Sequence, residues 1–159
     1  VSLMVANGLD GIGLFRTEFL ISSTGHVPTE EAQYTTYRRV VEEAAGAPVT
    51  IRTFDIGGDK PMGLSDRCMG RNPALGLRGI RRHLAKQPEE LRTQLRAILR
   101  AAVGGRVGIL IPMVTTVDDV IRAKGHLDEV RNELHKTGRA FSPETRFGAM
   151  IESSATAAS

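Results

Sequence analysis

The sequence predicts an α/β fold with a parallel sheet, because short apolar runs alternate with longer amphipathic segments. The apolar runs have the length and composition of strands covered on both faces, and they are residues 11–15, 49–54, 107–111 and 147–151. The segments with helical periodicity are residues 30–45, 88–103 and 117–136. Alternation of this kind indicates neighbouring parallel strands joined by crossover helices.

Each of the three expected helices has a start signal. Thr29 can cap the first helix. Pro88 suits the first position of the second helix, which Gly104 can end. Thr116 and Asp119 resemble a capping box at the start of the third helix, with Asp in place of the usual Glu.

Two architectures fit this alternation, an open doubly wound sheet and a (β/α)8 barrel. A barrel needs about 250 residues, and four strands in 159 residues would make half of one. The sequence ends just after the fourth strand, where a helix should begin, which favours a barrel cut short. We therefore expect residues 1–159 to form one partial (β/α)8 TIM-barrel domain, present as its first four or so β/α units.

Composition excludes several classes of protein. Hydrophobic residues make up 41% and charged residues 25%, as in ordinary globular domains. One cysteine, Cys68, cannot form an intrachain disulfide. Because no apolar run approaches the roughly 18–20 residues of a membrane span, we expect no membrane insertion. A net charge of +3 with 4% aromatic residues gives no indication of a nucleic-acid partner.

Charged residues follow the predicted strands at the edge where a barrel carries its chemistry. Arg16 follows the first strand, Arg52 lies within the second, which runs into Asp55, and Glu152 follows the fourth, while Arg78 lies in the long segment after the second strand. Arginine matches phosphate and carboxylate oxygens, and a carboxylate can hold Mg²⁺. The pattern fits a site that binds a small dianionic substrate together with a divalent metal ion. Such a site can stabilise the charge on a phosphoryl group during its transfer.

Plainer interpretations of the same residues remain open at this point. Arg16 could simply pair with Glu18, and Glu152 could be an ordinary acid at a helix start. Arg52 is harder to dismiss, because an arginine inside an apolar strand needs an anionic partner. The arginines that recur every fourth residue, Arg92, Arg96 and Arg100, are expected to form a solvated helix face, and the histidines, His26, His83, His126 and His135, to lie at the surface.

Several longer stretches resemble one family in their order along the chain. They are GIGLFRTEFL at 11–20, PTEE at 28–31, RTFDIGGDK at 52–60, NPALGLRGIR at 72–81, QLRAILRA at 94–101, IPMV at 111–114 and GAMIE at 148–152. The chain resembles the C-terminal phosphoenolpyruvate-binding barrel of Enzyme I of the bacterial phosphoenolpyruvate–sugar phosphotransferase system. Phosphoenolpyruvate synthase and pyruvate phosphate dikinase share this barrel, but they do not usually carry the DIGGDK run.

The resemblance implies roles for matched residues. Arg16 and Arg52 would grip the phosphate of phosphoenolpyruvate, and Arg78 would be a third substrate contact. Asp55 and Lys60 would lie in the loop near the substrate. Glu152 would be the first Mg²⁺ ligand, although Ser153-Ser154 follow it where the family usually has Thr-Pro. The second metal ligand, the proton-donating cysteine and the phosphorylated histidine are expected outside residues 1–159, so no catalytic residue is expected within them.

The implied activity is that of a phosphoenolpyruvate–protein phosphotransferase. With Mg²⁺, such an enzyme transfers the phosphoryl group of phosphoenolpyruvate to its own histidine and on to a phosphocarrier protein, bound by an N-terminal domain absent here. The resemblance also implies a cytoplasmic enzyme that forms a homodimer. The alternatives are a non-catalytic phosphoenolpyruvate-binding module and a synthase or dikinase relative.

Overall fold

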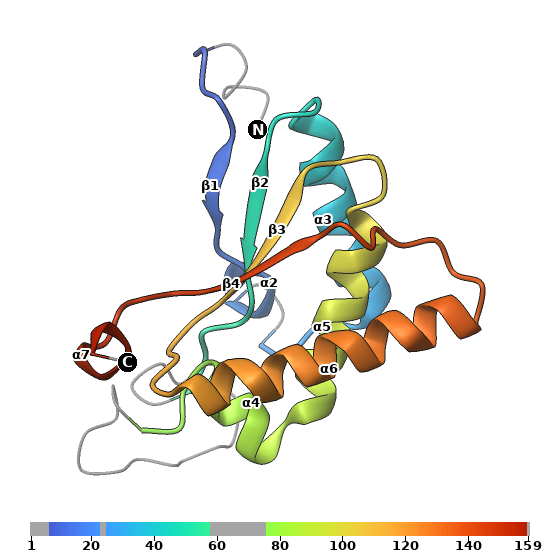
Figure 1. The fold of residues 1–159 in the computed structure, drawn as a ribbon. Coiled ribbons are helices and arrows are strands. Elements are labelled where there is room, and N and C mark those ends of the chain that lie inside the picture. Colours follow the sequence, from blue (N-terminus) through green and yellow to red (C-terminus); the bar gives the residue numbers. More distant parts are fainter. Residues whose placement is uncertain (1–6, 23–24, 58–75, 159) are drawn as a thin grey trace.

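The described part of the chain holds one parallel sheet, with its strands in the order β1-β2-β3-β4 (Figure 1). The structure is a computed structural model that describes residues 7–22, 25–57 and 76–158. The strands are β1 (Ile12–Phe15), β2 (Val49–Arg52), β3 (Val107–Ile111) and β4 (Arg146–Ala149). Each strand pairs in parallel with the next. The predicted α/β fold with a parallel sheet is confirmed, and the second and fourth strands end two residues earlier than expected.

The three predicted helices are confirmed, two of them ending two residues early. The helices are α2 (Phe19–Ser22), α3 (Glu30–Glu43), α4 (Ile80–Lys86), α5 (Pro88–Ala101), α6 (Val117–Lys136) and α7 (Ser154–Ala157). The short helix α2 was not predicted, because four residues are too few to show a helical period, whereas α7 begins after the fourth strand, where the sequence led us to expect a helix. Helix α4 lies in the long segment after β2 and directly precedes α5.

The predicted helix caps form as hydrogen bonds. The Thr29 hydroxyl accepts from the Ala32 amide at 3.3 Å at the start of α3. The Thr116 hydroxyl accepts from the Asp119 amide at 3.2 Å, and the Asp119 carboxylate accepts from the Thr116 amide at 3.0 Å. This second pair is a complete capping box, so Asp serves in place of Glu.

The core lies between the sheet and the helices α3, α5 and α6, which Figure 1 shows on one side of the strands. Leu91, Leu95 and Ile98 of α5 are fully buried there, as are Ile51 of β2 and, nearly so, Ile109 of β3. Side chains on the other face are less covered: Leu14 of β1 is 38% exposed. No helix in the described ranges is long and apolar enough to cross a membrane.

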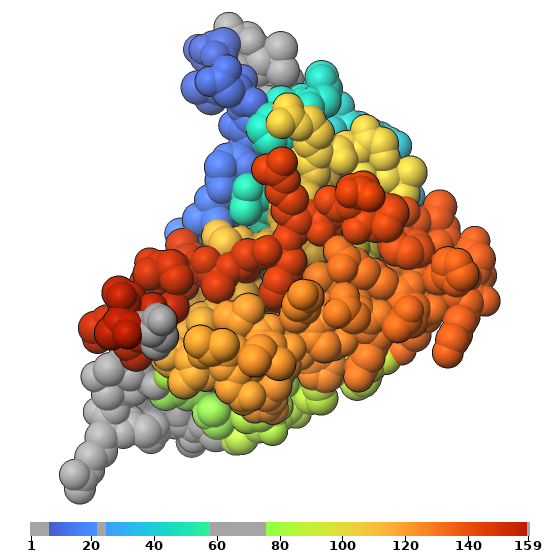
Figure 2. Space-filling model, viewed as in Figure 1, coloured from blue at the N-terminus to red at the C-terminus, as the bar shows by residue number. Residues whose placement is uncertain are grey.

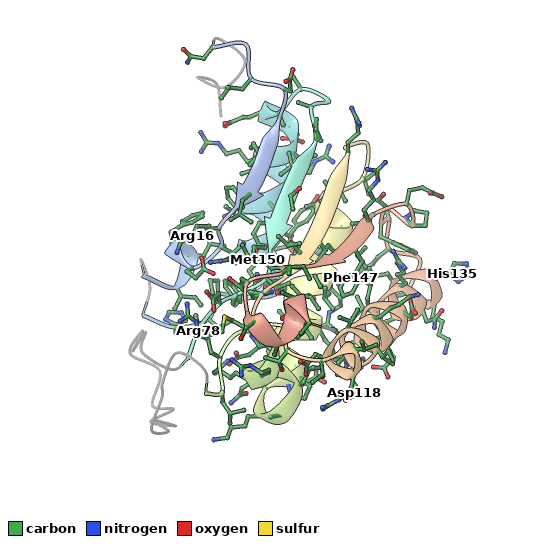
Figure 3. All side chains as sticks on the ribbon, turned by 60° about the vertical axis from the view of Figure 1, so that its left-hand side comes forward. Arg16, Arg78, Asp118, His135, Phe147 and Met150 are labelled. Carbon is green, nitrogen blue, oxygen red and sulfur yellow. The ribbon has the colours of Figure 1, made fainter. Side chains whose placement is uncertain are left out.

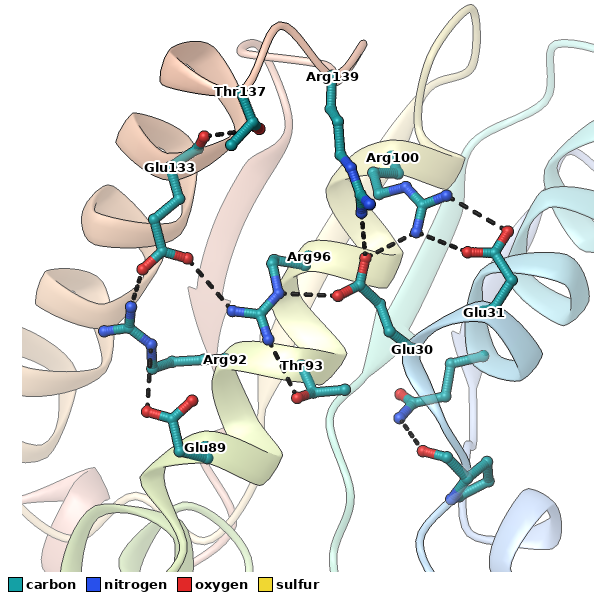
Figure 4. A network of polar contacts seen from close by, with 12 residues as sticks. Glu30, Glu31, Glu89, Arg92, Thr93, Arg96, Arg100, Glu133, Thr137 and Arg139 are labelled. Atoms are coloured by element: carbon teal, nitrogen blue, oxygen red, sulfur yellow. Dashed lines mark hydrogen bonds and ion pairs between the residues drawn. The ribbon is translucent and has the colours of Figure 1, made fainter.

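The arginines of α5 correct the expectation of a solvated helix face. Arg92, Arg96 and Arg100 have side chains only 15–21% exposed. Arg96 and Arg100 donate to Glu30 at the start of α3, while Arg92 and Arg96 donate to Glu133 of α6 (Figure 4). The fourth-residue spacing therefore builds an ion-pair network that joins three helices, and periodicity of charge could not distinguish this from a solvated face.

His83 is a second correction, because it is fully buried rather than at the surface. It lies in α4, its Nε2 is 3.8 Å from a Glu90 carboxylate oxygen, and neither ring nitrogen has a hydrogen-bond partner within the described ranges. Burial, followed by the neighbouring Arg82 charge, lowers the pKa of His83 to about 3. The imidazole is therefore neutral in the folded protein at neutral pH.

Candidate functional site

The carboxyl ends of β1 and β2 bring Arg16 and Arg52 to one edge of the sheet. Arg16 directly follows β1 and Arg52 is the last residue of β2, and the two strands are hydrogen-bonded neighbours. Figure 3 shows Arg16 and Arg78 toward the same part of the molecule as Met150, which follows β4. The convergence predicted from the strand order is thus present for these arginines.

A buried carboxylate fixes Arg52. Its Nη2 donates to Glu18 Oε1 at 2.8 Å, and both side chains are less than 10% exposed. Glu18 Oε1 also accepts from the Asp55 amide at 2.9 Å, which ties the loop after β1 to the loop after β2. Arg16 lies nearer to solvent, with its Nε 3.7 Å from Glu18 Oε2. The anionic partner that a buried Arg52 requires is therefore Glu18, which sequence reasoning had considered only as a partner of Arg16.

Asp55 fixes the third arginine in the same way. Arg78 donates from Nε and Nη2 to the two Asp55 carboxylate oxygens, at 2.7 and 2.9 Å. This is the bidentate geometry that gives an arginine a set direction. The Asp55 side chain is 3% exposed, and its Oδ2 also lies 3.6 Å from Arg52 Nη2. Asp55 therefore lies beneath the arginines and holds them.

Gly57 makes this approach possible. It pairs in an isolated antiparallel bridge with Arg78, and its φ is +106°, a region that favours glycine. A Cβ at this position would lie 2.5 Å from the Leu77 carbonyl oxygen. The glycine in the DIGGDK run thus lets residue 78 come alongside residue 57 and places Arg78 against Asp55. Lys60 and Cys68 lie outside the described residues.

Arg52 keeps part of its guanidinium free of oxygen acceptors. Within the described ranges its Nε is buried with no hydrogen-bond partner, and Nη1 contacts the Met150 sulfur at 4.0 Å. Sulfur is a weak acceptor, so this edge of the guanidinium remains poorly satisfied. A buried cationic donor without an oxygen partner is costly, and an anion would complete it.

Glu152 lies after β4 and faces the end of β3. Its Oε1 accepts from the Met113 amide at 2.7 Å, and Met113, two residues after β3, has a φ of +58°. Figure 2 shows the segment after β4, in red, at the surface beside α6, and Glu152 is exposed. The carboxylate is therefore held in place on one oxygen and is open to solvent.

The serines after Glu152 form the start of the short helix α7. Ser153 is the N-cap of α7, because its hydroxyl accepts from the Thr156 amide at 3.2 Å. The same hydroxyl lies 3.3 Å from the Val114 carbonyl oxygen, to which it donates. Serine and threonine are both favoured N-cap residues. The departure from the family pattern thus keeps the cap that follows Glu152.

The described carboxylates provide only part of a Mg²⁺ site. Within the described ranges no group of three His, Cys, Asp or Glu side chains could hold a metal. Glu18 and Asp55 are occupied by arginines, and among the described carboxylates near the strand ends this leaves Glu152 open to solvent. Mg²⁺ is commonly held by one or two carboxylates, water and substrate phosphate. The single Glu152 carboxylate fits part of such a ligand set.

The fold and the site together are those of an α/β protein with a cationic sheet edge suited to a small anion. A family model described as the phosphoenolpyruvate-binding domain of phosphoenolpyruvate-utilising enzymes matches residues 1–159. The chain belongs to this family.

Relatives that match nearly all of the chain have the name phosphoenolpyruvate-protein phosphotransferase. The protein of Staphylococcus epidermidis is 46% identical over 158 residues, which is 99% of this chain and 27% of the relative. That of Staphylococcus carnosus is 44% identical over 155 residues, 98% of this chain and 27% of the relative. That of Priestia megaterium is 44% identical over 149 residues, 94% of this chain and 26% of the relative. The chain thus spans about a quarter of the length of these relatives.

Proposed function

We propose that residues 1–159 supply the phosphoenolpyruvate-binding edge of a phosphoenolpyruvate–protein phosphotransferase of the Enzyme I type. The observation that carries the proposal is the buried Arg52, whose guanidinium is fixed by Glu18 on one side and, among the described residues, has no oxygen acceptor on the other. A phosphate oxygen would complete this guanidinium. The identity of 44–46% to relatives with that name supports the same conclusion.

In this proposal the arginines bind the substrate and the acids hold the arginines. Arg52 and Arg16 grip the phosphate, and Arg78 adds a third cation near it. Glu18 and Asp55 keep the guanidiniums in one orientation, so that little ordering is needed when the substrate binds. Lys60, in the same loop sequence, is proposed as a further substrate contact.

Glu152 is proposed as a ligand of Mg²⁺, with the phosphate of the substrate as another. Such an ion would neutralise the charge that spreads over the phosphoryl oxygens during transfer. The Met113 amide holds one Glu152 oxygen at 2.7 Å, which leaves the other for a metal. The residues that accept the phosphoryl group and protonate the product are proposed to lie outside residues 1–159.

The sheet is proposed to be the first half of a (β/α)8 barrel. Its order, β1-β2-β3-β4, follows the chain without reversal. A doubly wound sheet reverses its strand order at a switch point, whereas a barrel adds each strand beside the last. The resemblance to Enzyme I extends the proposal to a cytoplasmic homodimer that acts in sugar transport and passes its phosphoryl group to a phosphocarrier protein.

Phosphoryl transfer in the full natural protein that carries residues 1–159 tests this function. The purified protein is mixed with Mg²⁺ and phosphoenolpyruvate labelled on phosphorus, and both pyruvate release and acid-labile label on the protein are measured. We expect both, in equal amounts. Saturable binding without pyruvate release would instead indicate a non-catalytic binding module, and neither binding nor release would contradict the proposal.

A further inference from the structure

Gln94 of α5 is a fully buried polar residue beneath the arginine site. Its Oε1 accepts from the Phe54 amide at 2.9 Å. Its Nε2 donates to the Thr17 hydroxyl at 3.2 Å and to the Tyr37 hydroxyl at 3.0 Å. Thr17 lies between Arg16 and Glu18 in the chain, and Phe54 directly precedes Asp55. One side chain from the helical layer therefore bonds both loops that carry the site.

The direction of each hydrogen bond around Gln94 is determined. The Phe54 amide can only donate, so the Gln94 oxygen must face it and the Gln94 amide group must face the two hydroxyls. The Thr17 hydroxyl gives its proton to the Arg52 carbonyl at 2.9 Å, and so it accepts from Gln94. The bond to the Arg52 carbonyl connects Gln94 through Thr17 to the residue that carries the proposed function.

Tyr37 completes the arrangement on the side away from the site. Its hydroxyl donates to Gln33 Oε1 at 3.2 Å and accepts from Gln94. Burial raises the pKa of Tyr37 above its usual range, so the hydroxyl keeps its proton. Gln33 Nε2 in turn donates to the Pro28 carbonyl at 2.9 Å. Gln33 is as buried as Gln94 and belongs to the same network, but it bonds neither site loop.

We propose that Gln94 is a positioning residue, which sets the spacing between Arg16 and Arg52 by bonding the loop after β1 and the loop after β2 at once. This inference rests on the proposed function, since it assigns Gln94 to the same phosphoenolpyruvate site. Without Gln94 the Phe54 amide is left unpaired, Thr17 loses a donor, and the two loops can separate. If the arginines must be ordered when the substrate binds, the affinity for phosphoenolpyruvate falls, and KM rises more than kcat falls.

The test compares Gln94→Met with Gln33→Met in the full natural protein. Methionine has similar length and no strong hydrogen-bonding group, so both variants remove a buried amide at similar volume. We expect Gln94→Met to raise the KM for phosphoenolpyruvate about tenfold with kcat changed less than about threefold. Gln33→Met should lower thermal stability comparably and leave KM unchanged. Equal effects of both variants on KM, or none, would overturn the proposal.

Hydrogen exchange gives a readout that needs no substrate. In Gln94→Met the amide of Phe54 should exchange faster, whereas in Gln33→Met its exchange should match the wild type. Unchanged Phe54 exchange in Gln94→Met would overturn the positioning role. A wild type without phosphoenolpyruvate turnover would instead contradict the proposed function, so the two failures are distinguishable.

A near-isosteric variant covers the case in which Gln94→Met does not fold. Gln94→Glu keeps the acceptor for Phe54 but cannot donate to Thr17 or Tyr37. The Thr17 hydroxyl has one proton, so in Gln94→Glu it can donate either to the new carboxylate or to the Arg52 carbonyl, but not to both. A KM raised to a similar extent supports the proposal, and a wild-type KM in a folded Gln94→Glu protein contradicts it.

Discussion

The Arg52 guanidinium and the Glu18 carboxylate meet at 2.8 Å, and both side chains are almost wholly buried. Arg52 ends β2 and Glu18 follows β1, so the pair joins the ends of two neighbouring strands. A buried ion pair contributes little net stability but makes each partner depend on the other. The pair therefore orients the arginine, and several consequences can be measured.

Glu18→Gln should leave Arg52 buried without its main counter-charge. Asp55 Oδ2, 3.6 Å away, compensates only in part. We expect the free energy of unfolding, measured in urea at pH 7, to fall by about 3 kcal/mol. The matched control is Glu42→Gln, because Glu42 pairs with Arg38 on the exposed face of α3 at 2.7 Å. The control should cost less than about 0.5 kcal/mol, and equal costs for the two variants would show that burial of the pair has no consequence.

Glu30→Gln should weaken the network that joins α3, α5 and α6. Glu30 accepts from Arg96 at 2.9 Å, from Arg100 at 2.6 Å and from Arg139 at 3.3 Å (Figure 4). The expected loss of unfolding free energy at pH 7 is about 1–2 kcal/mol. Glu31→Gln is the control, because Glu31 also accepts from Arg100, at 3.0 Å, but is 67% exposed and contacts no other arginine of the network that Figure 4 draws; it should cost less than about 0.5 kcal/mol.

The contribution of Glu30 should also depend on pH. Burial would raise the pKa of Glu30, but the hydrogen bonds from Arg96 and Arg100 outweigh it, and the pKa lies below its ordinary value of 4.5. A carboxyl group with a lowered pKa stabilises the fold above its unfolded pKa, and this stability is lost as pH falls through the folded pKa. The difference between wild type and Glu30→Gln should therefore be full at pH 7 and vanish in acid. A difference that persists in acid would mean that charge is not its origin.

His83→Met should remove an acid sensitivity. The pKa of His83 is lowered from 6.5 to about 3 in the folded chain, so below pH 6.5 the unfolded chain takes up a proton that the folded chain does not. Wild type should therefore lose about 1 kcal/mol of stability relative to His83→Met between pH 6.5 and 5.5. Chemical unfolding at both pH values measures this. Parallel curves for wild type and His83→Met would contradict the account.

Ser153→Ala should loosen the segment that carries Glu152. The substitution removes the cap on the Thr156 amide and the hydrogen bond to the Val114 carbonyl. We expect a stability loss of about 1 kcal/mol and a Mg²⁺ requirement for activity that rises severalfold. Ser154→Ala, in the first position of α7, is the control and should change neither. Ser154→Pro should be tolerated, because the first helical position needs no amide donor; a collapse of activity in that variant would count against the assigned cap.

The strand ends of the site could be predicted from the sequence because parallel strands place them at one edge. Arg16 and Glu152 each follow an apolar run and Arg52 lies near the end of one, and this pattern requires no knowledge of side-chain contacts. The roles of Glu18 and Asp55 could not be predicted, since a carboxylate near an arginine in sequence has no fixed direction until two loops meet. The role of Gln94 could not be predicted either, because the sequence does not indicate which backbone amide will donate to a glutamine on an amphipathic helix.

The same reason explains the two interpretations that were wrong. The arginines of α5 recur every fourth residue, which is also the spacing of a solvated helix face. Only the positions of Glu30 and Glu133 on the adjacent helices show that the stripe is a helix–helix contact. His83 is buried by the packing of α4 against α5 and α6. No pattern in the sequence around His83 indicates this burial.

Equilibrium binding of phosphoenolpyruvate tests the central claim most directly. The full natural protein that carries residues 1–159 is titrated with phosphoenolpyruvate and Mg²⁺ by calorimetry, as wild type, Arg52→Lys and Arg106→Lys. Lysine keeps the charge but cannot donate to Glu18 and a phosphate at once in the fixed fork of an arginine. Arg52→Lys should weaken binding about 10- to 100-fold, while Arg106→Lys, an exposed change just before β3, should match the wild type. Wild-type affinity in a folded Arg52→Lys protein would contradict the assignment of Arg52 to the substrate phosphate.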